Sequence, residues 1–297
     1  MSYRSVSAVI ATYNMGQHVG KAVQSILNQQ NYPIAELHVV DDGSTDNTVE
    51  VMQQFDDARL HFHQLQHVGV CSARNYAIAR AQGDYIAFCD ADDLWTPNKL
   101  SVQMPVFDDP KVAVSYANLA PMDEQGNLRS PRERDFYSGD ILLQMFIRNC
   151  VPFGTAIVKK SVLDEVGGFN PTTTRSMDWD LWLRIGLKHH FQYVDEVTYH
   201  YLHWPGQMSN NYRGRFEWQS IIRNRFLDQH ADRIPKAYVK EGWATEYVEL
   251  GRNIALNEKK YVEPMRCYTK AMQYVPGYKP AVKAMVKMAI FYDHWHG

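Results

Sequence analysis

The sequence predicts an α/β fold, in which a mostly parallel sheet is flanked by helices and followed by a helical C-terminal region. Over residues 1–110, short runs rich in β-branched residues alternate with amphipathic stretches, and this pattern indicates strands that alternate with helices. After residue 210 the spacing of apolar residues is helical, without strand patterns. Because parallel strands are joined by helical crossovers, the alternation predicts a sheet that is covered on both faces.

The elements follow in order from the local patterns. In residues 1–110, strands are expected at 6–11, 37–40, 60–64 and 85–89. Helices are expected at 20–28 and 70–81, and a third helix, carrying Val49, Met52 and Phe55, should follow the capping turn at 41–46.

The rest of the chain divides near residue 210. Residues 111–210 predict short strands, a turn at Gly167-Gly168-Phe169 and a helix at 177–187. Helices are expected after that at 216–230, 237–257, 261–274 and 280–291. We therefore expect one domain over residues 1–210 and a helical region over residues 211–297.

Composition excludes several classes of protein. The 297 residues carry 31 Lys and Arg against 33 Asp and Glu, a net charge of −2, which argues against a basic nucleic-acid-binding protein. The N-terminus lacks the apolar core of a signal peptide, and no run reaches the ~18 apolar residues of a membrane span. The four cysteines are far apart, with no Cys-x-x-Cys, which argues against a zinc cluster and fits a reducing compartment. We expect a cytoplasmic protein.

Polar clusters follow three of the predicted strands. They are Thr12-Tyr13-Asn14, Asp41-Asp42 and Asp90-Ala91-Asp92-Asp93. Ligands of parallel sheets bind outside the carboxyl ends of the strands. The three clusters are therefore expected to converge on one crevice.

The pair Asp90 and Asp92 is the strongest chemical signal. Two alternating carboxylates after a buried strand can present oxygens to one hard divalent cation beside a phosphate. The structural alternative is a helix N-cap cluster around Asp93. A phosphohydrolase of the aspartyl-phosphate type expects Gly-Thr where Leu94-Trp95 stand, and the chain has no P-loop.

The second signal is Asp41-Asp42-Gly43-Ser44. As a capped turn it would be purely structural, and it lacks the ligand spacing of an EF-hand. A carboxylate at a strand end can also accept a hydrogen bond from the ring N–H of a uracil or a related base.

Several motifs in the same order resemble glycosyltransferase family two, the inverting enzymes with the GT-A fold. The motifs are Val9-Ile-Ala-Thr-Tyr-Asn14, Val39-Val-Asp-Asp-Gly-Ser-Thr-Asp46, Gly69 with Ala73-Arg-Asn75, Gly83-Asp-Tyr-Ile86 and Asp90-Ala-Asp-Asp93-Leu-Trp-Thr-Pro97. The resemblance is close over residues 5–107 and thinner to about 210. It implies a nucleotide-binding half over 1–110 and an acceptor half over 111–210.

The resemblance also implies roles for the residues of the nucleotide-binding half. The residues that it places at the donor are Thr12, Tyr13 and Asn14 against the nucleoside, Asp42 on the base, Arg74 near the nucleotide, Asp90 on the ribose side, and Ala91 beside it.

The resemblance implies Asp92 as the direct ligand of Mn²⁺ or Mg²⁺. His203 resembles a position from which some GT-A enzymes supply a third metal ligand. The chain has 12 histidines, so an ordinary packed or exposed histidine is the alternative.

Residues 176–184 resemble the family motif Glu-Asp-x-x-Leu-x-x-Arg, whose Asp is the catalytic base. Asp178 takes that place, although Met177 stands where Glu is usual, and Asp180 is a rival. Side chains two residues apart on a helix are separated by about 200° around its axis, so only one of the two carboxylates can face the crevice. We favour Asp178, which borders the apolar stripe, and expect Asp180 to form a surface ion pair with Arg184.

The resemblance thus implies a metal-dependent hexosyltransferase. It would move a sugar from a nucleotide-sugar, expected to be UDP-linked, to the hydroxyl of a glycan or lipid-linked acceptor, as in cell-surface polysaccharide synthesis. A catalytically silent nucleotide-sugar binding or scaffold protein is one alternative. A metal-dependent nucleotidyltransferase is another, but it should carry a glycine-rich phosphate loop where residues 11–14 stand.

The last predicted helix carries Lys279, Lys283 and Lys287 in a row. One interpretation is a surface helix whose apolar stripe packs on the domain. The other is peripheral contact with the anionic inner face of a membrane. The apolar positions are Val282, Met285, Val286 and Ala289.

Overall fold

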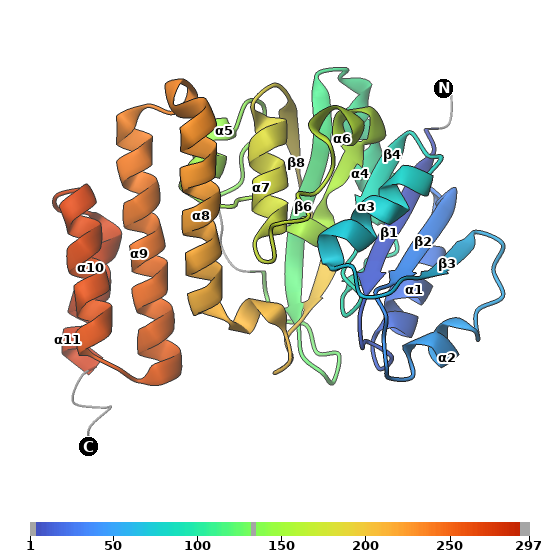
Figure 1. Ribbon diagram of the computed structural model, residues 1–297, viewed down its shortest axis with the longest axis horizontal. Helices are drawn as coiled ribbons and strands as arrows, with labels where there is room; N and C mark the ends of the chain where they lie inside the picture. Colours follow the sequence, from blue (N-terminus) through green and yellow to red (C-terminus); the bar gives the residue numbers. More distant parts are fainter. Residues whose placement is uncertain (1–3, 132–134, 292–297) are drawn as a thin grey trace. The chain divides into compact units, whose positions relative to one another are not determined.

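The computed structural model describes residues 4–131 and 135–291, which form two compact units (Figure 1). The sheet unit contains residues up to Ile141 and Cys150–Gln207, and the helical unit contains Leu142–Asn149 and the chain from Met208. The extreme N-terminus, which enters the expectation about a signal peptide, and the end of the basic tail lie outside the described residues.

The sheet unit is built on one eight-stranded mixed sheet in the order β3-β2-β1-β4-β7-β6-β8-β5. Its first half is parallel and consists of β3 (Leu60–Gln64), β2 (Glu36–Asp41), β1 (Val6–Thr12) and β4 (Tyr85–Phe88). In its second half, β7 (Ile157–Lys159) is antiparallel to both of its neighbours, β6 (Val112–Met122) is parallel to β8 (His190–Leu202), and β5 (Leu94–Trp95) is antiparallel to β8.

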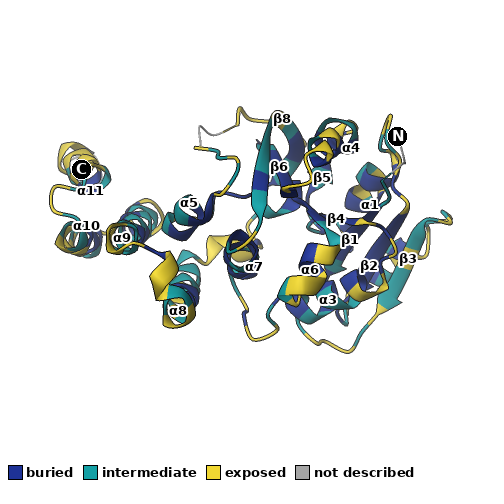
Figure 2. Ribbon diagram, turned by 90° about the horizontal axis from the view of Figure 1, so that it is seen from above, coloured by how far each residue is buried: buried dark blue, intermediate teal, exposed yellow. Residues whose placement is uncertain are grey.

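Helices cover both faces of this sheet (Figures 1 and 2). One face carries α1 (Val19–Leu27), α2 (Thr48–Met52), α4 (Lys99–Gln103) and the short 3-10 helix Met104–Asp108. The other carries α3 (Val70–Arg80), α6 (Lys160–Val166) and α7 (Met177–Gly186). In α1 the residues at three- and four-residue spacing are buried, so one apolar stripe fixes the helix on the sheet.

The predicted fold class is confirmed, with two differences in detail. The helix that was expected to carry Phe55 ends at Met52, and Phe55 packs on the core from the turn that follows. The expected short strands of residues 111–210 include two long ones, β6 with 11 residues and β8 with 13. The register between these two strands shifts between Val112 and Val114, between Ala117 and Asn118 and between Asn118 and Leu119, and such irregularities interrupt the regular alternation of side chains along a strand.

The helical unit contains α5 (Leu142–Ile147), α8 (Tyr212–His230), α9 (Lys236–Glu258), α10 (Val262–Tyr274) and α11 (Lys279–Phe291). Its boundary falls between Gln207 and Met208, and the segment 142–149, from the middle of the chain, packs with these helices. The core of α9, α10 and α11 is made of small and aromatic side chains: Ala244, Val248, Ala255, Tyr268, Ala271, Ala281, Ala284 and Met288.

A buried ion pair joins the elements of the helical unit. The guanidinium of Arg223 on α8 donates to the carboxylate of Glu246 on α9, and the side chains are 1% and 5% exposed. Arg223 also donates to the carbonyl oxygens of Phe146 and Ile147, each at 3.2 Å, which ties α5 to α8 and α9.

None of the helices in the described part of the chain combines the length and hydropathy that a membrane span requires.

Candidate active site

The polar clusters lie at one edge of the sheet because the strands that precede them are parallel. Thr12 at the end of β1 is in register with Asp41 at the end of β2, and the carbonyl of Thr12 accepts the N–H of Asp42 at 2.8 Å. On the other side of β1, the N–H of Cys89 donates to the carbonyl of Val9. The chain therefore leaves β4 at Asp90 on the same edge.

Asp42 holds the loop that leads into α3. Its buried carboxylate accepts the N–H of Val68 at 2.6 Å on Oδ1 and the N–H of Gly69 at 2.9 Å on Oδ2. Gly69 has φ +89°, a conformation that side chains disfavour. Each carboxylate oxygen has a second lone pair, so a ring N–H of a base could still bind there.

Tyr13 and Asn14 extend from the end of β1. The Tyr13 side chain is 43% exposed and its ring lies 4.6 Å from the ring of His67. Asn14 has φ +53°, and its Oδ1 accepts the N–H of Thr45 at 2.8 Å. An exposed aromatic ring beside this fixed loop is a surface on which a nucleobase could stack.

Asp90 lies at the centre of a group of charges. Its Oδ1 accepts Nη2 of Arg74 at 2.7 Å, and the Arg74 guanidinium is buried 4.1 Å above the ring of Phe153. Burial raises the pKa of Asp90 to about 6, Arg74 opposes the rise, and the negative charges of Asp92 and Asp178 add to it. The structure thus brings Asp178 to the same site as Asp90 and Asp92, from a helix almost ninety residues further along the chain.

Asp92 and Asp93 are held by the end of β8. Oδ2 of Asp92 accepts the indole N–H of Trp204 at 2.7 Å, and Oδ1 of Asp93 accepts the N–H of Leu202 at 2.7 Å. The hydroxyl of Tyr199 accepts the N–H of Asp90 at 3.0 Å. These partners were not predicted from the sequence, because they lie more than 100 residues away from the motif.

The two carboxylates at the start of α7 lie in different surroundings. Asp178 is in the first turn, is half-buried and contributes charge to the Asp90 group. Asp180 pairs with Arg184 at 2.9 Å, as predicted, but this pair is not on the surface. The Asp180 side chain is 8% exposed, and Arg184 also donates to the carbonyls of Val166 and Gly168, each at 2.7 Å.

Asn75 connects the nucleotide-binding half to the loop before α7. Its side chain accepts the N–H of Phe169 and donates to the carbonyl of the same residue, both at 2.8 Å. Gly168 has φ +65°, and a Cβ there would lie 2.5 Å from Oδ1 of Asn75. The predicted Gly167-Gly168-Phe169 turn is therefore needed for this contact as well as for chain reversal.

His203 lies at the end of β8 and is exposed. Its N–H donates to the carbonyl of Met122 at 2.8 Å, and its ring packs edge-on against Tyr201. Across residues 4–131 and 135–291, no three His, Cys, Asp or Glu side chains are arranged so that they could hold a metal ion. A third ligand from His203 is thus not preformed.

Comparison with known proteins identifies the class to which this fold and site belong. The model of the glycosyl transferase family 2 matches residues 7–167. The chain belongs to this family and is a glycosyltransferase, with the GT-A-like fold that its motifs imply.

Among its relatives, the putative teichuronic acid biosynthesis glycosyltransferase TuaG of Bacillus subtilis is 27% identical over 257 residues, which is 84% of this chain and 95% of TuaG. The glucosyltransferase WfaP of Escherichia coli is 28% identical over 234 residues, 76% of this chain and 88% of WfaP. An uncharacterized glycosyltransferase of Rickettsia conorii is longer: the match covers 61% of this chain and 31% of that relative.

Solved structures share the fold at low sequence identity. TarS 1-349 of S. aureus in complex with UDP-GlcNAc superposes with a TM-score of 0.67 at 17% identity, over 98% of this chain and 92% of TarS. The mannosyltransferase PcManGT of Pyrobaculum calidifontis, in complex with GDP-Man and Mn²⁺, gives a TM-score of 0.57 at 19% identity, over 97% of this chain and 76% of that one.

Proposed function

We propose that this glycosyltransferase transfers a sugar from a UDP-linked donor to a hydroxyl of a glycan or lipid-linked acceptor, with inversion at the anomeric carbon. The observation that carries the proposal is the convergence of Asp90, Asp92 and Asp178 at the strand ends. A relative and a protein of the same fold support these substrates: WfaP is named for a UDP-Glc donor and a diphosphoundecaprenol-linked acceptor, and TarS was solved in complex with UDP-GlcNAc.

In this proposal Asp178 is the general base. Its carboxylate accepts the proton of the acceptor hydroxyl as that hydroxyl attacks the anomeric carbon from the face opposite the leaving diphosphate. Tyr13 would lie against the base of the nucleotide, and Asp42 would accept its ring N–H. Arg74 would stay on Asp90, keeping that carboxylate ionised toward the ribose.

The site residues fit a divalent cation. Three carboxylates with one neighbouring guanidinium leave excess negative charge, and the charges of Asp92 and Asp178 add to the rise that burial causes in the pKa of Asp90. Oxygen ligands suit Mn²⁺ and Mg²⁺, and Asp92 would hold the ion with the diphosphate supplying further oxygens. Such an ion stabilises the negative charge that develops on a departing diphosphate.

Calorimetric titration of UDP and GDP tests the donor and the metal together. We expect UDP to bind more tightly than GDP, with an affinity that rises when Mn²⁺ replaces a chelator. Asp92→Ala should remove the response to Mn²⁺ and leave the fold intact. Tighter binding of GDP would contradict the UDP donor, and equal UDP affinity in excess chelator would contradict the metal role. If the protein binds UDP but transfers sugar from no UDP-sugar to any acceptor, it is the catalytically silent nucleotide-sugar binding protein instead.

We also propose that the enzyme works at the cytoplasmic face of the membrane and touches it through α11. The outward face of α11 carries two rows side by side: Val282, Val286 and Ile290, which are 42%, 51% and 65% exposed, and the lysines 279, 283 and 287. The residues that cover the core are Ala281, Ala284 and Met288 instead. Of the apolar positions that the surface-helix interpretation placed on the domain, Met285 packs against this core, whereas Val282, Val286 and Ala289 are exposed.

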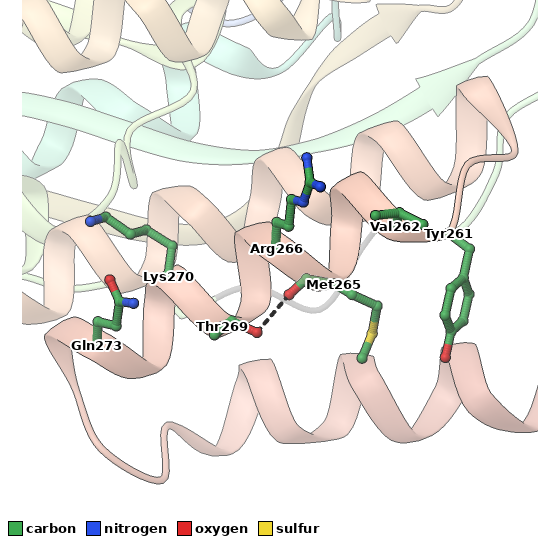
Figure 3. Close-up of a pocket in the computed structure, with 7 residues that line it drawn as sticks. All are labelled: Tyr261, Val262, Met265, Arg266, Thr269, Lys270 and Gln273. Atoms are coloured by element: carbon green, nitrogen blue, oxygen red, sulfur yellow. Dashed lines mark hydrogen bonds between the residues drawn. The ribbon is translucent and has the colours of Figure 1, made fainter.

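The neighbouring helix α10 also exposes apolar and cationic side chains. Figure 3 shows α10 running back along α11, with Tyr261 and Met265 directed toward α11. Beside them is a hollow of about 470 Å³ that Arg266 and Lys270 line. Val262 at the start of α10 is 60% exposed, at the same end of this helical hairpin as Ile290. Exposed apolar side chains and cations thus occur on both helices of the hairpin.

Exposed apolar side chains next to lysines on α11 favour an anionic membrane as the partner. Residues 279–291 contain three lysines and no acidic residue, and each lysine near an anionic surface contributes about 1 kcal/mol. A second copy of the chain, docked symmetrically on the same face, would bring lysines against lysines. Three exposed apolar side chains would add a shallow, reversible insertion.

Co-sedimentation with vesicles tests this contact. We expect binding to vesicles of phosphatidylcholine with phosphatidylglycerol, weak binding to phosphatidylcholine alone, and loss of binding on reversal of Lys279, Lys283 and Lys287 to Glu. Val286→Ser should weaken binding without a charge change. Reversal of Lys21, Lys111 and Lys236 is the matched control. Unchanged sedimentation of the α11 variants, or α11-dependent dimers without vesicles, would contradict the proposal.

A further inference from the structure

Trp204 makes a short, direct contact with the carboxylate proposed to bind the metal. Its indole N–H donates to Oδ2 of Asp92 at 2.7 Å, a distance typical of strong hydrogen bonds to an ionised acceptor. The indole engages one oxygen of Asp92. The other oxygen, Oδ1, therefore keeps both of its lone pairs for a cation, whereas Oδ2 keeps only one.

The indole is held in place on several sides. Its ring centroid lies 5.1 Å from that of His18. Gly206 packs so closely on the ring that a Cβ there would lie 2.1 Å from Cζ3 of Trp204. The side chain of Gln207, which is 8% exposed, closes the turn by donating to the carbonyl of Leu202.

The two residues before Trp204 fix the same turn to the acidic motif and to β6. Leu202 donates its N–H to Asp93, and His203 donates its N–H to the carbonyl of Met122. The position of the indole relative to Asp92 is thus set by the end of β8 and not by a free side-chain rotamer. A fixed donor on one oxygen restricts the rotation of the carboxylate about its last torsion.

We propose that Trp204 is a positioning residue that orients the Asp92 carboxylate for the metal–diphosphate of the donor. The inference rests on the proposed metal role of Asp92. Partners that orient a metal ligand typically change metal affinity by about 10- to 100-fold when they are removed. Trp204 therefore acts on the binding of the metal and its diphosphate and not on proton transfer at Asp178.

The test compares UDP affinity by calorimetry in Mn²⁺ and in chelator. Trp204→Phe keeps an aromatic ring in the turn but has no N–H, so we expect the affinity in Mn²⁺ to fall about 10-fold or more while the affinity in chelator stays the same. Gly206→Ala should give the same loss, because the added Cβ displaces the indole without removing it. Trp218→Phe, on α8, is the matched control and should change neither value.

The outcomes separate the two proposals. If the wild-type protein binds UDP equally with and without Mn²⁺, the metal role fails and the role of Trp204 fails with it. If the wild type responds to Mn²⁺ and Trp204→Phe responds equally, only the role of Trp204 fails. A loss of affinity of the same size in chelator would show that Trp204 merely supports the shape of the site, and would also overturn the inference.

Discussion

On α7, Asp178 and Asp180 show how two residues of one type acquire different chemistry. Asp178 adds its charge to the carboxylates at the strand ends, whereas Asp180 is enclosed with Arg184, whose guanidinium also binds two backbone carbonyls. The first arrangement suits a base that must reach a substrate. The second fixes the loop between α6 and α7.

Replacing Asp178 should therefore reduce mainly catalysis, and replacing Asp180 should reduce mainly stability. Asp178→Asn cannot accept the acceptor proton, so we expect kcat to fall by about 10² to 10⁴ with little change in UDP affinity. Asp180→Asn removes the charge of a buried carboxylate that pairs with the partly buried Arg184, so we expect a loss of about 1 to 3 kcal/mol of unfolding free energy and a smaller loss of kcat. Steady-state kinetics and urea unfolding measure both. An inactive Asp180→Asn beside an active Asp178→Asn would assign the base to Asp180.

Prediction of the site from the sequence depended on how local each signal is. Asp90, Asp92 and Asp178 belong to short motifs, and their strand-end and helix-start positions follow from nearby residues. Trp204, Tyr199 and Asn75 complete the site through contacts 94 to 112 residues away in the chain. The spacing of residues in a single sequence cannot predict contacts between residues so far apart in the chain.

Among the elements, the outer strands β2 and β3 carry a stack of histidines. The rings of His38 and His63 are nearly parallel, at 5.5 Å, and Nδ1 of His38 lies 3.2 Å from Nε2 of His63. Oε2 of Glu36 lies 3.1 Å from Nε2 of His38 and 3.8 Å from Nε2 of His61. Burial lowers the pKa values of His38 and His63, and the positive charge of Arg80 contributes to both shifts.

This stack should make stability depend on pH below neutrality. A histidine whose pKa is lowered in the folded state binds fewer protons there than in the unfolded chain, so stability falls as pH falls through 6.5. Hydrogen bonds and the nearby His38 lower the pKa of Glu36 against the effect of burial, so Glu36 acts in the same direction but only below the ordinary pKa of a glutamate, about 4.5. We expect the Tm to drop between pH 7.5 and 5.5, and His63→Gln to reduce that drop. His230→Gln, at the end of α8, is the control, and an equal drop in all three proteins would contradict the assignment.

The ion pair between α8 and α9 gives a second prediction for the elements. Burial lowers the pKa of Arg223 to about 9, so the guanidinium remains charged at neutral pH. Glu246→Gln leaves that charge without its partner, and we expect a loss of about 3 to 5 kcal/mol in urea unfolding. The double replacement Arg223→Met with Glu246→Leu should lose much less. The exposed pair Glu249 and Arg252 is the control, since Glu249→Gln should cost less than about 1 kcal/mol.

For the whole molecule, the sequence predicted the classes and approximate bounds of the elements better than their connectivity. The parallel half of the sheet follows from strand–helix alternation, because each crossover places the next strand beside an earlier one. The strand order of the second half does not follow from this rule. There β7 lies between β4 and β6 and is antiparallel to both, and β5 pairs with β8, which follows it by about a hundred residues. The assignment of residues 142–149 to the helical unit depends on partners that come sixty or more residues later.

That assignment has a consequence for how the protein is synthesised. Leu142, Met145 and Phe146 on α5 are buried among helices that follow residue 208. At about 5 to 20 residues per second, a ribosome needs on the order of 5 to 20 s to proceed from Asn149 to the end of α9 at Glu258. During this interval the nascent sheet unit carries an uncovered apolar segment in the middle of its chain. Completion of this part of the fold must therefore await the later helices, and the growing chain presents a binding site for chaperones that the finished enzyme does not have.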